Sequence, residues 1–436
     1  MTSGIDSHLQ NFRQLDGVGP ATVAALRERA LARFAEVGFP TTALEDWKYT
    51  SLAPLADRPF ELAVDGAHNG TAVLASTPRL ETGYELVYVN GRFAPSVSTL
   101  GALPKGAIVA SLADALRTHP ELIEPHLARY ASFDSAAESL TALNTAFIRD
   151  GAFVYVPLGT ALDAPIHCLF VSLGGDGGTV THPRTLIVAG EGSRVTVVEH
   201  YLGDGIYWTN AVTEAVLGAG ASLTHYRVQR DSPRAFHVGT VAVEQAADSR
   251  YGSRSISLGG ALVRNDIGTR LDAPGATCTF DGLYLASGAQ HVDHHTTIDH
   301  RQPRGTSREL YKGIMDGRAT GIFNGKVFVR PHAQQSDAQQ MNKNLLLSDD
   351  AQIETKPQLE IFADDVKCSH GATIGQLDED AIFYLRARGI DAADARQMLI
   401  FAFANELIEP VAIGPLRDLL TRELGERLQG AQGDTP

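Results

Sequence analysis

Cysteine is scarce in this chain of 436 residues. The three cysteines, Cys168, Cys278 and Cys368, lie far apart, and none belongs to a C-x-x-C pair. An odd and sparse set of this kind argues against a disulfide framework and is typical of a reducing compartment. We therefore expect a cytoplasmic protein.

Long apolar runs and an excess of basic residues are also missing. No apolar stretch approaches the roughly 20 residues that a transmembrane helix needs. The first ten residues are polar and have neither a basic start nor an apolar core, so we expect no secretory signal. Acidic residues outnumber basic ones, 51 to 37, for a net charge of -14. This balance disfavours binding to nucleic acid or to an anionic membrane.

Helical patterns are present mainly toward the two ends of the chain. Residues 21–37 have apolar residues at helical spacing, and a second helical stretch, residues 111–130, is interrupted by two prolines. Between these stretches, Asn90-Gly91 predicts a tight hairpin turn. The chain becomes helical again near Leu377, and residues 416–428 predict a last helix with leucines on one side.

The middle of the chain predicts a repetitive β-structure. Short β-branched and aromatic runs alternate with small turns from about residue 153 onward. The turn residues Gly192, Gly220, Asp248 and Gly275 follow one another at almost equal intervals. A near-constant step in an all-β stretch favours a solenoid whose coils stack at about 4.8 Å. Two Greek-key sheets are the alternative.

We favour a mainly β fold with a parallel β-helix core over residues 146–374. A mainly helical N-terminal region, residues 1–145, and a helical C-terminal region, residues 375–436, would flank it. The turns at residues 316–319 and 348–351 would continue the same series with wider gaps. Because the helical segments lie at the two ends, we expect them to cover the open edges that a solenoid leaves exposed.

The strongest local chemistry lies in residues 364–371, with the sequence D-D-V-K-C-S-H-G. On a strand, Cys368 and His370 point to the same face. A thiol and an imidazole can both bind a soft or borderline metal, and Lys367 and a protonated His370 would lower the pKa of the thiol. Two ligands cannot close a four-coordinate site, so the others would come from elsewhere or from a second chain. A buried cysteine beside a surface histidine is an equally good interpretation.

A second cluster, residues 291–300, is dense in histidine and aspartate. Alternation places His291, Asp293 and His295 on one face of a strand, and His294 and His300 on the other. The first three could hold the catalytic metal of a metalloenzyme with an open coordination position. We favour the alternative, a polar ladder in which stacked residues satisfy one another's hydrogen bonds.

Two motifs are similar to nucleotide-binding or DNA-binding elements but differ in detail. Residues 321–327 are one residue short of a phosphate loop and have Val327 where a Ser or Thr would bind magnesium. No helix follows to hold the phosphates. Residues 15–22 resemble a helix-hairpin-helix module, but a single copy in an acidic chain is better interpreted as a helix start.

Residues 356–373, which read K-P-Q-L-E-I-F-A-D-D-V-K-C-S-H-G-A-T, resemble the signature of the SufB/SufD family of the SUF iron–sulfur cluster assembly system. Further matches follow in order at residues 45–50, 89–91, 182–184, 291–300, 311–313 and 380–390. Together they span nearly the whole chain. The low cysteine content and the Cys-Ser-His-Gly form of the late motif are more similar to the SufD branch than to the SufB branch.

The resemblance implies a right-handed parallel β-helix between two helical regions, and a scaffold subunit rather than an enzyme. Members of this kind pair with a SufB-like subunit through the β-helix. They hold a SufC-like ABC ATPase, which hydrolyses ATP, through the C-terminal helices. For that docking surface the matched motif supplies Phe383, Tyr384, Arg388 and Gly389.

The resemblance also implies a site at the subunit interface. His370, with Cys368, would hold one side of a transient iron–sulfur cluster or iron site, and the SufB-like partner would supply the remaining thiolates. No cofactor would bind tightly to the isolated chain, which could form a homodimer through the same face. A purely structural role for both residues is the other interpretation.

Overall fold

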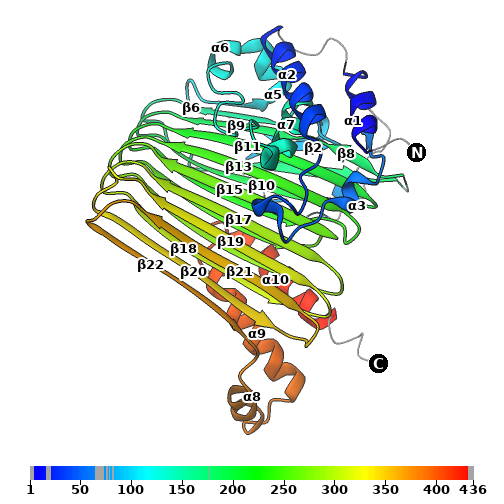
Figure 1. Cartoon of the computed structure of the whole chain (residues 1–436), viewed down its shortest axis with the longest axis vertical. Coiled ribbons are helices and arrows are strands. Elements are labelled where there is room, and N and C mark those ends of the chain that lie inside the picture. The colour runs from blue at the N-terminus through cyan, green and yellow to red at the C-terminus, as the bar shows by residue number, and fades with distance from the viewer. Residues whose placement is uncertain are drawn as a thin grey trace.

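The structure, a computed structural model, describes residues 4–15, 21–63, 73, 74, 77, 79, 80, 83–175 and 177–430. It is a long parallel β-solenoid with helices at the N-terminal and C-terminal ends of the chain (Figure 1). The predicted mainly β solenoid fold is therefore confirmed. The hairpin-like segment at residues 15–22 lies largely outside the described residues. Within the described ranges, no helix is long and apolar enough to cross a membrane.

The described strands of the solenoid form two sheets, which we call sheet A and sheet B. Sheet A contains β1 (Glu61–Leu62), β5 (Ile108–Ser111), β6 (Ala152–Val156), β8 (Thr179–Thr181), β9 (Arg184–Ala189), β11 (Tyr207–Leu217), β13 (Phe236–Gln245), β15 (Leu262–Leu271), β17 (His291–His300), β19 (Thr320–Val329) and β21 (Gln352–Ile361). Sheet B contains β2 (Tyr84–Val89), β3 (Arg92–Phe93), β4 (Thr99–Leu100), β7 (Ile166–Leu173), β10 (Arg194–Asp204), β12 (Ser222–Arg230), β14 (Arg250–Leu258), β16 (Thr277–Ala286), β18 (Thr306–Met315), β20 (Ser336–Leu346) and β22 (Val366–Gly375).

Each coil adds one strand to each sheet, so odd-numbered strands from β9 stack in sheet A and even-numbered strands from β10 stack in sheet B. Residues in register form inward-facing rows, because strands are parallel and side chains alternate between the two faces. One such row is Val195, Leu223, Tyr251 and Cys278, all of which are buried in the core between the sheets.

The turns that lead from sheet A into sheet B confirm the predicted repeat. Gly192, Gly220, Asp248 and Gly275 all have positive φ angles, of 64°, 65°, 55° and 76°. Each of their N–H groups donates to a carbonyl in the next coil, as Gly192 does to Ala219 at 2.8 Å. The almost equal intervals in the sequence therefore reflect a stacked column of turn residues in the left-handed region.

The later turns at residues 316–319 and 348–351 do not continue this column. They lead from sheet B back into sheet A, at the opposite end of the strands. The column itself continues through Arg304 and Gln335, whose φ angles are 60° and 61°. The expectation failed because each coil has two turns, and both kinds are rich in glycine, aspartate and small residues.

The first coil is closed by strands from the N-terminal region, not by helices. β2 pairs in parallel with β7 and carries β3 and β4 antiparallel beside it, while β5 pairs antiparallel with β6. The predicted hairpin turn joins β2 to β3, with Asn90 and Gly91 both at positive φ. The region before residue 146 therefore contributes strands to both sheets as well as helices.

The N-terminal helices lie on the outer face of sheet A. They are α1 (Gly4–Phe12), α2 (Ala21–Val37), the short 3₁₀ helix Glu45–Trp47, α3 (Ala53–Ala56), α5 (Leu112–Thr118), α6 (Pro120–Ile123), the 3₁₀ helix Ala136–Glu138 and α7 (Ser139–Ala146). Their apolar residues pack on Trp208, Phe236 and Leu262 of the sheet. A fully buried ion pair between Arg184 and Glu214, 2.6 Å long, adds to this contact, and Glu214 also accepts the backbone N–H groups of residues 128, 130 and 131.

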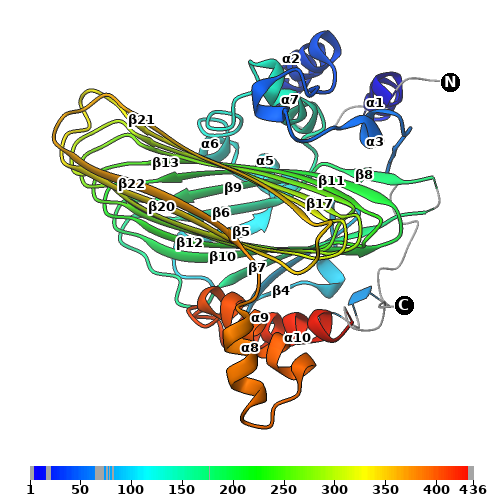
Figure 2. The same cartoon turned by 60° about the horizontal axis from the view of Figure 1, so that its bottom comes forward.

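The C-terminal helices are α8 (Glu379–Arg386), α9 (Ala392–Ile408) and α10 (Gly414–Gly430). α9 and α10 pack on the outer face of sheet B, where Leu407 and Leu420 belong to one cluster with Tyr226 and Leu283. Figure 2 shows that the two groups of helices lie on opposite faces of the solenoid and that α8 projects away from it. The helices therefore cover the faces of the sheets, and the expectation that they cover the open edges of the solenoid is wrong.

Candidate functional site at the open end of the solenoid

The last strands, β21 in sheet A and β22 in sheet B, form an open edge among the described residues. The N–H of Gln352, the first residue of β21, donates to the carbonyl of Ala319, just before β19. The N–H of Phe362, just after β21, donates to the carbonyl of Val329, the last residue of β19. N–H groups of even-numbered residues thus face β19, and those of odd-numbered residues face outward. One outward position is Pro357, which has no N–H to expose.

The same alternation applies to β22, but there the odd-numbered residues face the preceding strand. Asp337 of β20 donates its N–H to Gly305, toward the preceding coil, and Lys367 is in register with Asp337. Lys367 therefore directs its N–H group toward β20, while Cys368, His370 and Ala372 direct theirs outward. Unpaired N–H and C=O groups of this kind are a template for pairing with another chain.

Cys368 and His370 lie two residues apart on β22, so their side chains share one face, as predicted. The Cys368 side chain packs against the core between the sheets, so the His370 side chain, two residues on, is directed to the same inward side. Because β22 is the last strand, Cys368 is half-buried and His370 is exposed. The structure therefore places a thiol and an imidazole together in the mouth of the open end.

The state of the thiol differs from the prediction. Burial raises the pKa of Cys368, and the backbone N–H of Ala338 only partly opposes this effect. Lys367 points to the other face of β22, so its ammonium group does not approach the thiol from the inward side. In this chain alone, burial therefore favours the neutral thiol and shifts the pKa in the opposite direction from the one expected.

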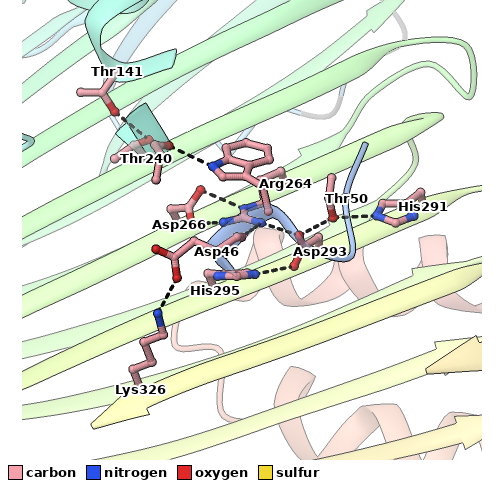
Figure 3. Close-up of polar contacts among 12 residues, drawn as sticks. Asp46, Thr50, Thr141, Thr240, Arg264, Asp266, His291, Asp293, His295 and Lys326 are labelled. Carbon is pink, nitrogen blue, oxygen red and sulfur yellow. Dashed lines mark hydrogen bonds and ion pairs between the residues drawn. The ribbon is translucent and has the colours of Figure 1, made fainter. Parts of the chain in front are cut away.

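The second predicted cluster lies elsewhere, on the outer face of sheet A (Figure 3). Thr50 donates its hydroxyl to Asp293 at 2.5 Å and lies 2.9 Å from the Nε2 atom of His291. Arg264 donates to the same carboxylate at 2.6 Å, and the Nε2 atom of His295 lies 3.1 Å from its other oxygen. The three predicted residues are therefore brought together, but around an ion pair.

The charges explain why this cluster is a polar anchor. Burial alone would raise the pKa of Asp293, but Arg264 and His295 outweigh burial and hold that pKa well below its ordinary value. Arg264 occupies the position beside the carboxylate that a metal cation would need. Among the described residues, no group of three His, Cys, Asp or Glu side chains is arranged to hold a metal ion. The geometry thus fits the polar ladder and not the metalloenzyme site.

The cluster anchors the segment of residues 45–50 to the solenoid. The Arg264 guanidinium lies 4.2 Å from the centre of the Trp47 ring and donates to the Asp46 carbonyl at 2.9 Å. Lys326 of β19 pairs with the Asp46 carboxylate at 2.5 Å, as Figure 3 shows, and Lys356 of β21 pairs with Glu45. We call residues 45–50 the strap, because they cross the outer face of sheet A from β15 to β21.

The predicted docking residues are gathered at α8. Phe383 and Tyr384 are large aromatic residues, yet they are 72% and 55% exposed. The Arg388 guanidinium lies 4.1 Å from the centre of the Tyr384 ring, and Gly389 turns the chain toward α9 with a φ of 89°. A shallow groove beside Phe383 continues along residues 386–392. The tip of the C-terminal region therefore presents an uncovered aromatic surface.

Residues 321–327, similar to a phosphate loop, lie within strand β19, where no helix N-terminus holds phosphates.

Glu309 and Gln340, beneath the open end, are functional candidates that the sequence did not single out. Their signal was weak, because they are far apart in the sequence and match no motif.

Comparison with known proteins agrees with this architecture. Residues 171–403 match the model of the SufBD core domain of SUF system FeS cluster assembly, and residues 5–168 match that of the SufBD protein N-terminal region. An iron–sulfur cluster assembly SufBD family protein of Synechocystis is 34% identical over 431 residues, which cover 95% of this chain and 94% of that protein.

Relatives named SufD are similar over the same length. The iron–sulfur cluster assembly protein SufD of Escherichia coli is 33% identical over 408 residues, which cover 92% of each chain. That of Bacillus subtilis is 26% identical over 425 residues, which cover 94% of this chain and 95% of that protein. These similarities support the SufD branch expected from the sequence. The chain belongs to the SufBD family of the SUF system for iron–sulfur cluster assembly.

Proposed function

We propose that this chain is a non-ATPase scaffold subunit that assembles iron–sulfur clusters together with a SufB-like subunit and a SufC-like ABC ATPase. The observation that carries the proposal is the open end of the solenoid, where a strand edge that no other described strand pairs with lies beside an exposed imidazole and a half-buried thiol. Iron or a nascent cluster is cargo in this scheme, and the isolated chain holds no cofactor tightly.

The SufB-like subunit would pair with the edge formed by β21 and β22. The outward positions of β22, at residues 368, 370, 372 and 374, offer N–H and C=O groups to an added strand. Such pairing would bury the mouth of the solenoid and bring the partner's thiolates to Cys368 and His370. In the absence of that partner, a second copy of this chain could occupy the same edge.

The ATPase would dock on α8. Exposed aromatic side chains such as Phe383 and Tyr384 are typical anchors of a protein interface. The connection from the end of β22 to the start of α8 consists only of residues 376–378, and Asp378 caps the helix. A movement of α8 driven by ATP would therefore act directly on β22, a strand of the interface.

Two substitutions should separate the two partners. Ala372→Pro removes an outward N–H of β22 without breaking its pairing to β20, and should weaken SufB-like binding by tenfold or more. Phe383→Asp places a charge on the exposed α8 surface and should weaken SufC-like binding to a similar extent. Pull-down of purified subunits measures both, and each variant is the control for the other. If either variant binds both partners normally, the corresponding surface is wrongly assigned.

His370 is tested by its alanine variant in the reconstituted three-subunit complex. Cluster formation, followed by absorbance, should fall at least tenfold in His370→Ala because the imidazole ligand is lost. His332→Ala, which removes an exposed histidine near the turn before β20, is the matched control and should form clusters normally. Undiminished cluster formation in His370→Ala would remove the open-end imidazole from the mechanism.

A further inference from the structure

Three inward-facing residues of sheet B form one row that ends at the open edge. Glu309 of β18, Gln340 of β20 and His370 of β22 are in register. Neighbouring strands of a sheet lie about 4.8 Å apart, so the side chains of this row stack on one another. Glu309 and Gln340 are 5% and 2% exposed, whereas His370 is exposed at the mouth. The row therefore leads from the interior to the candidate site.

The Gln340 amide is held in one orientation. Its Nε2 atom donates a hydrogen bond of 2.6 Å to the Oε2 atom of Glu309, one coil deeper. Its carbonyl oxygen, Oε1, is buried and has no hydrogen-bond partner among the described residues. A buried carbonyl oxygen without a donor costs free energy, so this atom is a site where a donor would be favoured. The next residue in the row is His370.

The opposite strand leaves room for this arrangement. Gly325 of β19 faces Gln340, and a Cβ atom there would lie only 2.2 Å from Gln340 Nε2. In the last coil the residue in register with Gly325 is Pro357, so the repeat places Pro357 opposite His370. Proline has neither an N–H nor a polar side chain to offer the imidazole. Gln340, in register with His370 on the neighbouring strand, has a carbonyl oxygen that can accept a hydrogen bond from the imidazole.

We propose that Gln340, oriented by Glu309, is a positioning residue for His370. In this arrangement Oε1 accepts the N–H of one imidazole nitrogen and directs the other nitrogen toward iron at the open edge. The inference rests on the function proposed above and names a support for its imidazole ligand. Histidines that bind metals almost always donate their other N–H to an oxygen acceptor, which fixes the tautomer and the ring orientation.

The test uses five variants of the full chain in the reconstituted complex, with ferrous iron as the probe, and His370→Ala is the variant that lacks the imidazole. Gln340→Met keeps the length of the side chain and removes the amide, while Glu309→Leu removes the group that orients it. Glu309→Gln retains a carbonyl oxygen that can accept from Gln340 Nε2. Gln339→Met alters the exposed, outward-facing neighbour on the same strand and is the matched control.

We expect the Kd for iron to rise 10- to 100-fold in Gln340→Met and Glu309→Leu. The Kd should be unchanged in Glu309→Gln and Gln339→Met. Nitrogen-15 NMR of His370 should show one tautomer in Glu309→Gln and Gln339→Met. It should show a mixture of tautomers in Gln340→Met and Glu309→Leu. The inference is overturned if Gln340→Met leaves both the iron affinity and the His370 tautomer unaffected while His370→Ala loses iron. If His370→Ala binds iron as tightly as the unmodified chain, the proposed function fails instead, and this support fails with it.

Discussion

Replacing Arg264 by methionine is expected to lower the free energy of unfolding by about 3–5 kcal/mol, because it leaves the Asp293 carboxylate buried without its cation. Arg264 and Asp293 are 2% and 1% exposed at their side chains, and the pair is 2.6 Å long. Arg264 also supports the Trp47 ring and the Asp46 carbonyl. Its loss should therefore free the strap as well as weaken the fold.

Two measurements check this expectation. Denaturant unfolding reports the loss of stability, and limited proteolysis reports whether residues 45–50 become accessible. The control is Arg250→Met, which changes an exposed arginine at the start of β14 and should be nearly neutral. A partial recovery is expected when Asp293→Asn is combined with Arg264→Met, because the uncompensated charge is then removed. Equal stability of Arg264→Met and the unmodified chain would show that the pair is not an anchor.

Replacing Glu309 by glutamine is expected to stabilise the chain above pH 7 by roughly 3 kcal/mol. Burial raises the pKa of Glu309 from 4.5 to about 7, although the hydrogen bond from Gln340 and the nearby Thr296 hydroxyl oppose the shift. The folded state therefore holds a proton that the unfolded state releases near pH 4.5. The contribution of Glu309 is fully present below about pH 4.5 and is lost as the pH rises through 7.

Glutamine has the same shape and no proton to lose, so Glu309→Gln should remove this pH dependence. Unfolding free energies measured from pH 5 to pH 8.5 should show stability falling with pH in the unmodified chain more steeply than in the variant. Glu406→Gln is a useful comparison, because that carboxylate is partly exposed and Lys312 lowers its pKa, the opposite direction. Parallel pH profiles of Glu309→Gln and the unmodified chain would contradict the assignment of a neutral Glu309.

The solenoid was predictable because its cause is local. A turn residue with positive φ recurs in every coil, and glycine and aspartate at residues 192, 220, 248 and 275 are suited to that conformation. The position of Cys368 and His370 on one face of a strand was predictable for a similar reason, since strand periodicity needs no knowledge of other coils. Both predictions depend only on residues close in the sequence.

Expectations that depend on distant residues were less successful. The position of the helices on the faces of the sheets depends on apolar surfaces such as Trp208 and Tyr226, which are separated from the helices by long stretches of chain. The thiol pKa at Cys368 depends on burial against the core, and the neighbouring Lys367 points away. Neither burial nor direction across a coil can be deduced from adjacent residues alone.

The sequence by itself determined the stacked coils, the shared face of the thiol and the imidazole, and the family to which the chain is similar. Only the tertiary structure decided that the strap meets Asp293, which is distant in the sequence, and that Glu309 and Gln340 lie beneath His370. The physical reason is that coil length varies. The step from Glu309 to Gln340 and the step from Gln340 to His370 are unequal, and both are longer than the steps between the early turn residues. No constant period therefore reveals which side chains share a row.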